Sequence, residues 1–171
     1  MHLNHVRAVV TGGASGLGFA VAQFLVANGG KVALFDVNAE RGAAAVAELG
    51  AGNAHFFRTD VSDEAGVAAN VQAAKDAMGG LNAAINCAGI LGSGRVLGKE
   101  GAMPLSTFAT TVMVNLVGSF NVAKAAAALM QGNEPGEDGE RGVIVNTASV
   151  AAYEGQIGQA AYAASKGGVV G

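Results

Sequence analysis

The chain has 171 residues, of which 51% are hydrophobic and 13% are charged, and its formal net charge at pH 7 is -3. This composition indicates one soluble globular domain with enough apolar side chains for a sizeable core. Its ten Lys and Arg residues are scattered and only 5% of the chain is aromatic, which excludes the basic surface typical of a nucleic-acid-binding protein.

Membrane segments, disulfides and metal sites are also disfavoured. Apolar runs such as 19–22 and 24–27 are too short to span a bilayer. The first five residues lack the charged and apolar regions of a signal peptide, so we expect a cytoplasmic protein without a membrane partner. The single cysteine, Cys87, excludes an internal disulfide, and the three dispersed histidines give no metal-ligand spacing.

A strand, a glycine-rich turn and a helix are expected at the start of the chain. Residues 6–10 form an apolar, β-branched run that stops at Thr11, and residues 19–28 have the pattern of a helix. Between them, residues 12–18 read Gly-Gly-Ala-Ser-Gly-Leu-Gly. A glycine pattern alone is weak evidence, but between a strand and a helix its backbone N–H groups and the helix dipole can hold a pyrophosphate.

A second strand, at 31–35, ends in Asp36, twenty residues after Gly16. A carboxylate at this place can accept hydrogen bonds from both adenosine ribose hydroxyls and would repel a 2′-phosphate, which favours NAD over NADP. Ala14 and Ser15 stand where a basic partner for that phosphate would be useful. The alternative is that Asp36 is only a solvated acid at the end of a strand.

Strands and helices continue to alternate along the chain. The pattern predicts helices at 39–49, closed by Gly50, and at 63–78, capped by Ser62, and one long helix at 105–130 with Asn115 buried in its middle. It predicts strands at 55–57, 81–85 and 143–145, with loops at 92–103 and 131–142. We therefore expect a single Rossmann-type α/β domain over 1–171, with a doubly wound parallel sheet between two helix layers (αβα).

The segment from Ser149 to Lys166 carries the candidate chemistry. On a helix after Gly158, Tyr162 and Lys166 lie one turn apart on the same face, where the ammonium would stabilise the phenolate. Ser149, just past the expected strand, could bind the oxygen whose proton Tyr162 exchanges. This is an acid–base site for an alcohol and a ketone. The alternative is a Tyr–Lys pair on a solvated helix.

Six motifs, in order, resemble the short-chain dehydrogenase/reductase family across essentially the whole chain. The matching positions are 11–18, 60–61, 86–89, Asn115, Ser149 and 162–166. The resemblance implies that Ser149 binds the substrate oxygen and that Tyr162 transfers the proton. It implies that Lys166 binds the nicotinamide ribose and stabilises the Tyr162 phenolate. It also implies that Asp60 hydrogen-bonds the adenine amine and that Asn115 binds a water that relays protons outward. Position 87 departs from the family, where asparagine is commoner, but only its backbone is expected to matter.

These assignments define the expected site. The residues expected to contact NAD are Gly12, Ser15, Gly16, Leu17, Gly18, Asp36, Asp60, Val61, Asn86, Cys87, Ala88, Gly89, Tyr162 and Lys166. The residues expected to contact the substrate are Ser149, Gln156 and Tyr162. No metal is expected.

The loops look closer to one branch of this family, the type II 3-hydroxyacyl-CoA dehydrogenases, also described as 17β-hydroxysteroid dehydrogenases type 10. That branch implies oxidation of a 3-hydroxyacyl-CoA with NAD in fatty acid metabolism. Hydroxysteroids and short alcohols stay open as substrates. The family also implies a homodimer or homotetramer and two further strands after residue 171, so we expect the chain to be a fragment. The alternative to an enzyme is a non-catalytic dinucleotide-binding scaffold, but such proteins usually lose the Tyr or the Lys.

Overall fold

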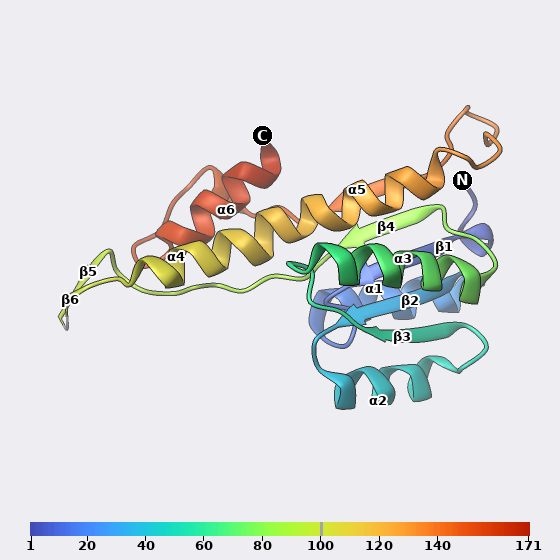
Figure 1. Cartoon of the computed structure of the whole chain (residues 1–171), viewed down its shortest axis with the longest axis horizontal. Helices are drawn as coiled ribbons and strands as arrows, with labels where there is room; N and C mark the ends of the chain where they lie inside the picture. Colours follow the sequence, from blue (N-terminus) through green and yellow to red (C-terminus); the bar gives the residue numbers. More distant parts are fainter. Residues whose placement is uncertain (100) are drawn as a thin grey trace.

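Five parallel strands form the central sheet of the computed structural model, which describes residues 1–99 and 101–171 (Figure 1). They are β1 (Arg7–Thr11), β2 (Lys31–Asp36), β3 (Ala54–Arg58), β4 (Ala83–Asn86) and β7 (Val143–Asn146), in the order β3-β2-β1-β4-β7. The chain winds from β1 out to β3 and then returns to the other side of β1. The strand order therefore reverses between β1 and β4, which is where doubly wound folds bind ligands.

The register aligns the carboxyl ends of the strands. Thr11 pairs with Phe35 on one side and with Asn86 on the other, and Asn86 pairs with Asn146. Asp36, the last residue of β2, pairs with Arg58. The polar residues predicted to follow the strands are thus gathered along one edge of the sheet.

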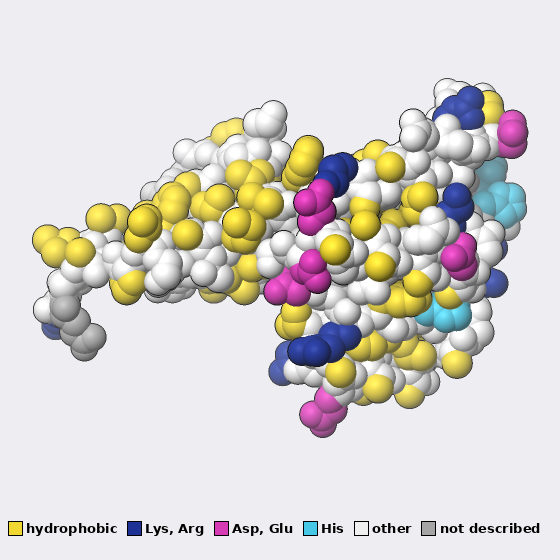
Figure 2. Space-filling view, viewed as in Figure 1, with side chains coloured by type: hydrophobic (Ala, Val, Ile, Leu, Met, Phe, Trp, Pro, Cys, Tyr) yellow, Lys and Arg dark blue, Asp and Glu magenta, His cyan; other side chains and the backbone are white. Residues whose placement is uncertain are grey.

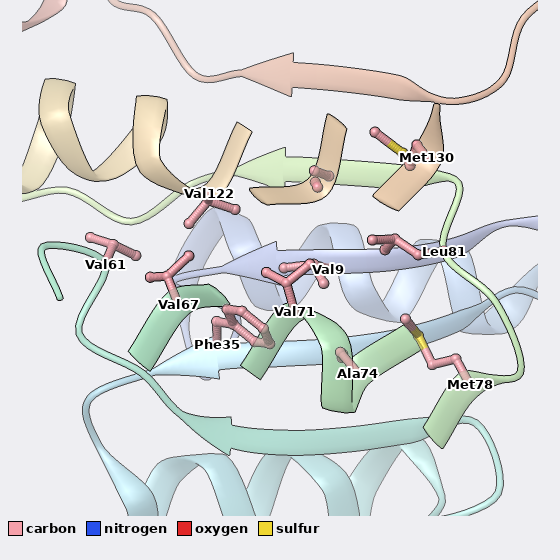
Figure 3. Close-up of a cluster of buried hydrophobic side chains, with 13 residues drawn as sticks. Val9, Phe35, Val61, Val67, Val71, Ala74, Met78, Leu81, Val122 and Met130 are labelled. Atoms are coloured by element: carbon pink, nitrogen blue, oxygen red, sulfur yellow. The ribbon is translucent and has the colours of Figure 1, made fainter. Parts of the chain in front are cut away.

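Helices cover both faces of the sheet, as predicted for a parallel sheet with apolar strands. On one face, α1 (Gly16–Ala27) and α2 (Ala39–Leu49) pack on alternate residues of the strands, including Val10 and Leu34. On the other face lie α3 (Glu64–Met78) and α5 (Gly118–Met130). Figure 3 shows α3 and α5 side chains meeting Val9 and Phe35 of the sheet.

The predicted long helix is interrupted by a wider turn. It comprises α4 (Leu105–Val112), a π-helical turn (Met113–Val117) and α5. Asn115 lies in the π-helical turn and is completely buried, as predicted for the middle of this helix. A π-helical turn inserts an extra residue into a helix and is often found at functional sites. The sequence predicted one continuous helix over 105–130 and did not indicate this turn.

By length and composition alone, the 26 residues Leu105–Met130 could cross a membrane, so our expectation that every apolar segment is too short does not hold for this helix. Its central residue Asn115 is hydrogen-bonded inside the protein, and Lys124 forms an ion pair with Glu64 of α3. These contacts are those of a helix in a layered domain.

The last helix, α6 (Ala160–Val170), packs beside α4 and the π-helical turn. Together α4 and α6 extend beyond the sheet, and a small hairpin of β5 (Leu97–Gly98) and β6 (Gly101–Ala102) lies at their far end (Figure 1). This hairpin falls within the loop predicted at 92–103, whose residue Glu100 lies outside the described residues. The backbone N–H of Gly94 bonds the carbonyl of Gly158, which ties the hairpin region to the start of α6.

One predicted helix cap was wrong. The N-cap of α3 is Asp63, whose carboxylate accepts the N–H of Gly66. The Ser62 hydroxyl instead donates to Asp60, because the chain turns tightly between β3 and α3. Gly50 closes α2 as predicted, with a φ of 89° that favours glycine.

Candidate active site

A cleft of about 490 Å³ lies at the carboxyl edge of the sheet. Eleven of the residues predicted to contact a dinucleotide line it: Gly12, Ser15, Gly16, Leu17, Gly18, Asp36, Asp60, Val61, Cys87, Ala88 and Gly89. The sequence did not point to five other lining residues, which are Phe35, Val37, Thr59, Ile90 and Val114. A second cleft of about 550 Å³ lies at the opposite edge, next to Arg7 and Asn82, and contains none of the predicted residues.

The glycine turn needs glycine for two different reasons. Gly12 and Gly16 have φ values of 62° and 55°, in the left-handed region. Gly18 is buried against the turn itself, and a Cβ there would lie 2.4 Å from the carbonyl oxygen of Gly12. The turn leads directly into α1, so free N–H groups of the first helical turn face the cleft region. These features fit the pyrophosphate of a dinucleotide.

Thr11 joins the glycine turn to the loop after β4. Its hydroxyl oxygen accepts hydrogen bonds of 3.0 Å from the N–H groups of both Cys87 and Ala88, and its side chain is 1% exposed. A Cβ on Gly12 would lie 3.0 Å from the nitrogen of Ala88, so the two loops are in close contact. The sequence identified Thr11 as the end of a strand and the first residue of the glycine motif, but not as a link between these two loops. Its hydroxyl holds together the two walls of the cleft.

Two carboxylates lie at the rim of the cleft. Asp36 accepts hydrogen bonds from the N–H groups of Ala14 and Asn38, at 3.3 and 3.0 Å, which fixes it beside the glycine turn. Asp60 accepts both the hydroxyl and the N–H of Ser62, and these two bonds lower the pKa of the Asp60 carboxyl. Both groups therefore present fixed hydrogen-bond acceptors at the cleft.

The predicted pair on α6 is brought together. The Lys166 Nζ lies 5.8 Å from the centre of the Tyr162 ring and donates to the carbonyl of Thr147, just after β7. Lys166 is 5% exposed, and this burial lowers its pKa, although the nearby Cys87 thiol acts in the opposite direction. The Thr147 hydroxyl donates weakly to the Cys87 sulfur, at 3.5 Å. Lys166 is thus connected through Thr147 to the lining of the cleft.

The other predicted residues have different environments. Ser149 is half-buried, and its hydroxyl oxygen accepts the N–H of Ala151 at 3.2 Å. Gln156 is exposed on the segment before α6. Asn86 is 3% exposed and donates to Ser119 and Asn146, so its side chain holds β4, β7 and α5 together at the base of the cleft.

Asn115 uses all the hydrogen-bonding groups of its side chain within the protein. Its Oδ1 accepts the N–H of Ile90, and its Nδ2 donates to the carbonyl of Ile90 and to the hydroxyl of Ser165, at 2.8 to 2.9 Å. Its backbone carbonyl accepts a hydrogen bond from the Ser119 hydroxyl.

The arrangement combines a dinucleotide cleft with a buried ammonium beside a phenol, which is the equipment of an alcohol dehydrogenase. No group of three or more possible metal ligands occurs in the part of the chain that the structure describes. A family model of short chain dehydrogenases matches residues 6–171. The chain belongs to the short-chain dehydrogenase family. This family supplies dinucleotide-dependent oxidoreductases, and the fold, strand order and glycine turn of the chain agree with that assignment.

Several relatives share the description 3-hydroxyacyl-CoA dehydrogenase type-2. The chain is 48% identical over 171 residues to the 3-hydroxyacyl-CoA dehydrogenase type-2 of Drosophila melanogaster, covering 99% of this chain and 67% of that protein. It is 48% identical over 166 residues to the human protein of the same description, covering 96% of this chain and 63% of the human one.

A solved relative has a similar fold. The crystal structure of 3-hydroxyacyl-CoA dehydrogenase type-2 from Mycobacterium avium superposes with a TM-score of 0.88 at 42% identity, covering 95% of this chain and 64% of that one. The present chain therefore spans about two thirds of the length of these short-chain dehydrogenases.

Proposed function

We propose that this short-chain dehydrogenase interconverts a 3-hydroxyacyl-CoA and the corresponding 3-ketoacyl-CoA with NAD. The observation that carries the proposal is the buried Lys166 ammonium beside the Tyr162 ring, connected through Thr147 to the dinucleotide cleft. The substrate class is supported by relatives that are 47% to 48% identical to this chain and are described as 3-hydroxyacyl-CoA dehydrogenases type-2.

NAD is favoured as the dinucleotide because of the acid at the rim. The Asp36 carboxylate is held beside Ala14 of the glycine turn, where it would accept hydrogen bonds from ribose hydroxyls and repel a 2′-phosphate. The close packing of Gly12 and Gly18 shapes the turn, and Gly16 leaves open space at the N-terminus of α1, where a pyrophosphate would bind. When bound there, the nicotinamide supplies hydride transfer.

The residues of this chain supply binding and proton transfer. Ser149 would hold the substrate oxygen, and Tyr162 would take the proton of the hydroxyl during oxidation or return it during reduction. The Lys166 ammonium lies where it favours the phenolate. Asn115, whose side chain joins Ile90 to Ser165, would hold the water that relays protons outward.

NADH formation tests the proposal directly. The purified full-length protein is incubated with NAD and, separately, with a short and a medium 3-hydroxyacyl-CoA, a hydroxysteroid and a simple secondary alcohol, and absorbance at the NADH band is followed. The highest kcat/KM is expected for a 3-hydroxyacyl-CoA. A hydroxysteroid or simple alcohol with the higher kcat/KM would replace the proposed substrate class. Binding of NADH with no turnover of any compound would favour the non-catalytic scaffold.

We also propose that the chain functions as a homodimer or homotetramer. Large apolar side chains are exposed along the long helix, including Leu105, Met113, Val117 and Phe120, with exposed fractions of 40% to 80%. Figure 2 shows apolar side chains gathered over the part of the molecule that contains α4 and α6. Such a surface is typical of contact with another subunit. Light scattering at micromolar concentration should give a multiple of the monomer mass, and a monomer mass would contradict this.

A further inference from the structure

Ser165 is completely buried between α6 and the π-helical turn. Its hydroxyl oxygen accepts a hydrogen bond of 2.9 Å from the Asn115 amide, and its proton is donated to the carbonyl of Tyr162 at 2.7 Å. Ser165 is one of the three residues between Tyr162 and Lys166, and its hydroxyl both accepts and donates a hydrogen bond. Each of these bonds uses the hydroxyl and not the Cβ of Ser165.

The partner of Ser165 connects α6 to the cleft. The same Asn115 amide binds both the N–H and the carbonyl of Ile90, and Ile90 lines the dinucleotide cleft. A continuous set of hydrogen bonds thus runs from the cleft wall at Ile90, through Asn115 and Ser165, to the backbone of Tyr162. Asn115 is 0% exposed, so loss of the Ser165 hydroxyl would leave a buried N–H of the Asn115 amide without its partner.

We propose that Ser165 is a positioning residue. Its hydroxyl fixes the rotation of α6 about its axis and the position of α6 along that axis, so that Tyr162 and Lys166 face the cleft in reactive geometry. The proposal rests on the proposed dehydrogenase function of this site. The Ser165 hydroxyl bonds neither a residue that lines the cleft nor the Lys166 ammonium, so it acts through the backbone of α6. Two titratable groups lie near this pair: Lys166 lies beside the Tyr162 ring, and the Cys87 thiol lies near Lys166.

Replacement of Ser165 by alanine tests the hydroxyl while leaving the Cβ in place. For Ser165→Ala in the full-length protein we expect kcat to fall by about 10 to 100-fold, the range that a misplacement near 1 Å can produce. The KM for NAD should change by less than about 3-fold, because the glycine turn and Asp36 are untouched. Ser165→Cys, which keeps a weak donor and acceptor of similar size, should restore part of kcat.

A spectroscopic measurement separates positioning from a general loss of stability. The tyrosinate absorbance of Tyr162 is obtained as the difference between each protein and the same protein carrying Tyr162→Phe. It should appear at higher pH in Ser165→Ala than in the wild type, since a displaced ammonium stabilises the phenolate less. The matched control is Thr111→Val, which removes another completely buried hydroxyl, one that bonds only to a carbonyl of its own helix.

Three outcomes would overturn the proposal. The first is an unchanged kcat and an unchanged tyrosinate titration in Ser165→Ala. The second is the same pair of changes in Thr111→Val, which would mean that lost stability causes them. The third is a Ser165→Cys protein, folded by circular dichroism, that behaves as Ser165→Ala does in both measurements. The titration needs no substrate, so it still tests the positioning role if no 3-hydroxyacyl-CoA is turned over and the proposed function fails.

Discussion

The carbonyl oxygen of Gly12 lies only 2.4 Å from the position that the Cβ of a larger residue at Gly18 would occupy. The first helical turn of α1 is therefore pressed against the turn that begins it. For Gly18→Ala we expect a loss of about 1 to 3 kcal/mol of unfolding free energy, the usual cost of overpacking, because backbone must move. NADH affinity should fall by at least about 10-fold, since the displaced N–H groups no longer converge. Calorimetric titration and urea unfolding measure both quantities.

Two other glycines serve as controls for that change. A Cβ at Gly16 meets no atom within 4 Å, so Gly16→Ala carries only the cost of its positive φ. That cost is about 1 to 2 kcal/mol. Gly52, in the exposed turn before β3, has room for a Cβ and no positive φ, so Gly52→Ala should leave NADH affinity unchanged. Wild-type affinity in Gly18→Ala would show that the pyrophosphate does not bind at this turn.

The hydroxyl of Thr11 gives a second prediction. In Thr11→Val the shape is kept, but the N–H groups of Cys87 and Ala88 lose their acceptor. A buried donor left without a partner costs about 1 to 3 kcal/mol, so the unfolding free energy should fall by about that amount or more. Thermal unfolding with and without NADH checks this, and the stabilisation by NADH should also shrink. Thr11→Ser keeps the hydroxyl and should retain most of the unfolding free energy and of the stabilisation by NADH. If Thr11→Ser and Thr11→Val lost the same amount of unfolding free energy, packing and not the hydroxyl would be responsible.

Dinucleotide choice depends on Asp36. In Asp36→Ala the repulsion of a 2′-phosphate is removed together with the acceptor for ribose hydroxyls. We expect the ratio of kcat/KM for NAD to that for NADP to fall by about 10 to 100-fold, through a loss with NAD and a gain with NADP. An equal ratio in the wild type and the variant would contradict the role of this carboxylate. Glu40, an exposed acid on α2, offers the control change Glu40→Ala, which should leave the ratio unaltered.

The sequence predicted the order of elements because strands, turns and helices here have strong local signals. The run before Thr11, the glycines at 12–18 and the acid ending β2 all depend on residues close together in the chain, and the structure has them as predicted. The pairing of Tyr162 with Lys166 was also predictable, since both lie on one helix face.

Features that depend on contacts between distant segments were not predictable in the same way. The Thr11 hydroxyl meets N–H groups more than seventy positions away, at Cys87 and Ala88. The Asn115 amide is shared by Ile90 and Ser165, and the π-helical turn around it was not predicted. Position in the cytoplasm and subunit number stay predictions, since neither follows from the geometry of one chain.

Tyr162 and Tyr153 provide a matched test of the acid–base assignment. Tyr162→Phe should reduce kcat by more than about 1000-fold, because the proposed proton acceptor is then removed, while NADH binding should persist. Tyr153 is 77% exposed and lacks a lysine partner, so Tyr153→Phe should change kcat by less than about 2-fold. Steady-state kinetics and NADH titration measure these effects. Wild-type kcat in Tyr162→Phe would show that another residue carries the proton.

Burial of Lys166 makes a prediction about stability and pH. Burial lowers the pKa of Lys166 in the folded protein below its ordinary 10.5, so the charged form is disfavoured by folding. Between the lowered value and about 10.5 the unfolded chain holds more protons on this residue than the folded one, and stability should rise with pH across that window. Below the window the full cost of burying the ammonium is present.

The change Lys166→Met isolates this effect, because it keeps a long unbranched side chain and removes the ionising group. In a Cys87→Ala background, so that the neighbouring thiol does not titrate, urea unfolding is measured from about pH 7 to about pH 10.5. The unfolding free energy of the protein that retains Lys166, minus that of the Lys166→Met variant, should increase steadily with pH. This holds whatever the sign of the difference at neutral pH, where loss of the bond to Thr147 also contributes. Parallel curves would mean that Lys166 does not titrate in this window. Turnover should be lost in Lys166→Met at every pH, since no ammonium then favours the Tyr162 phenolate.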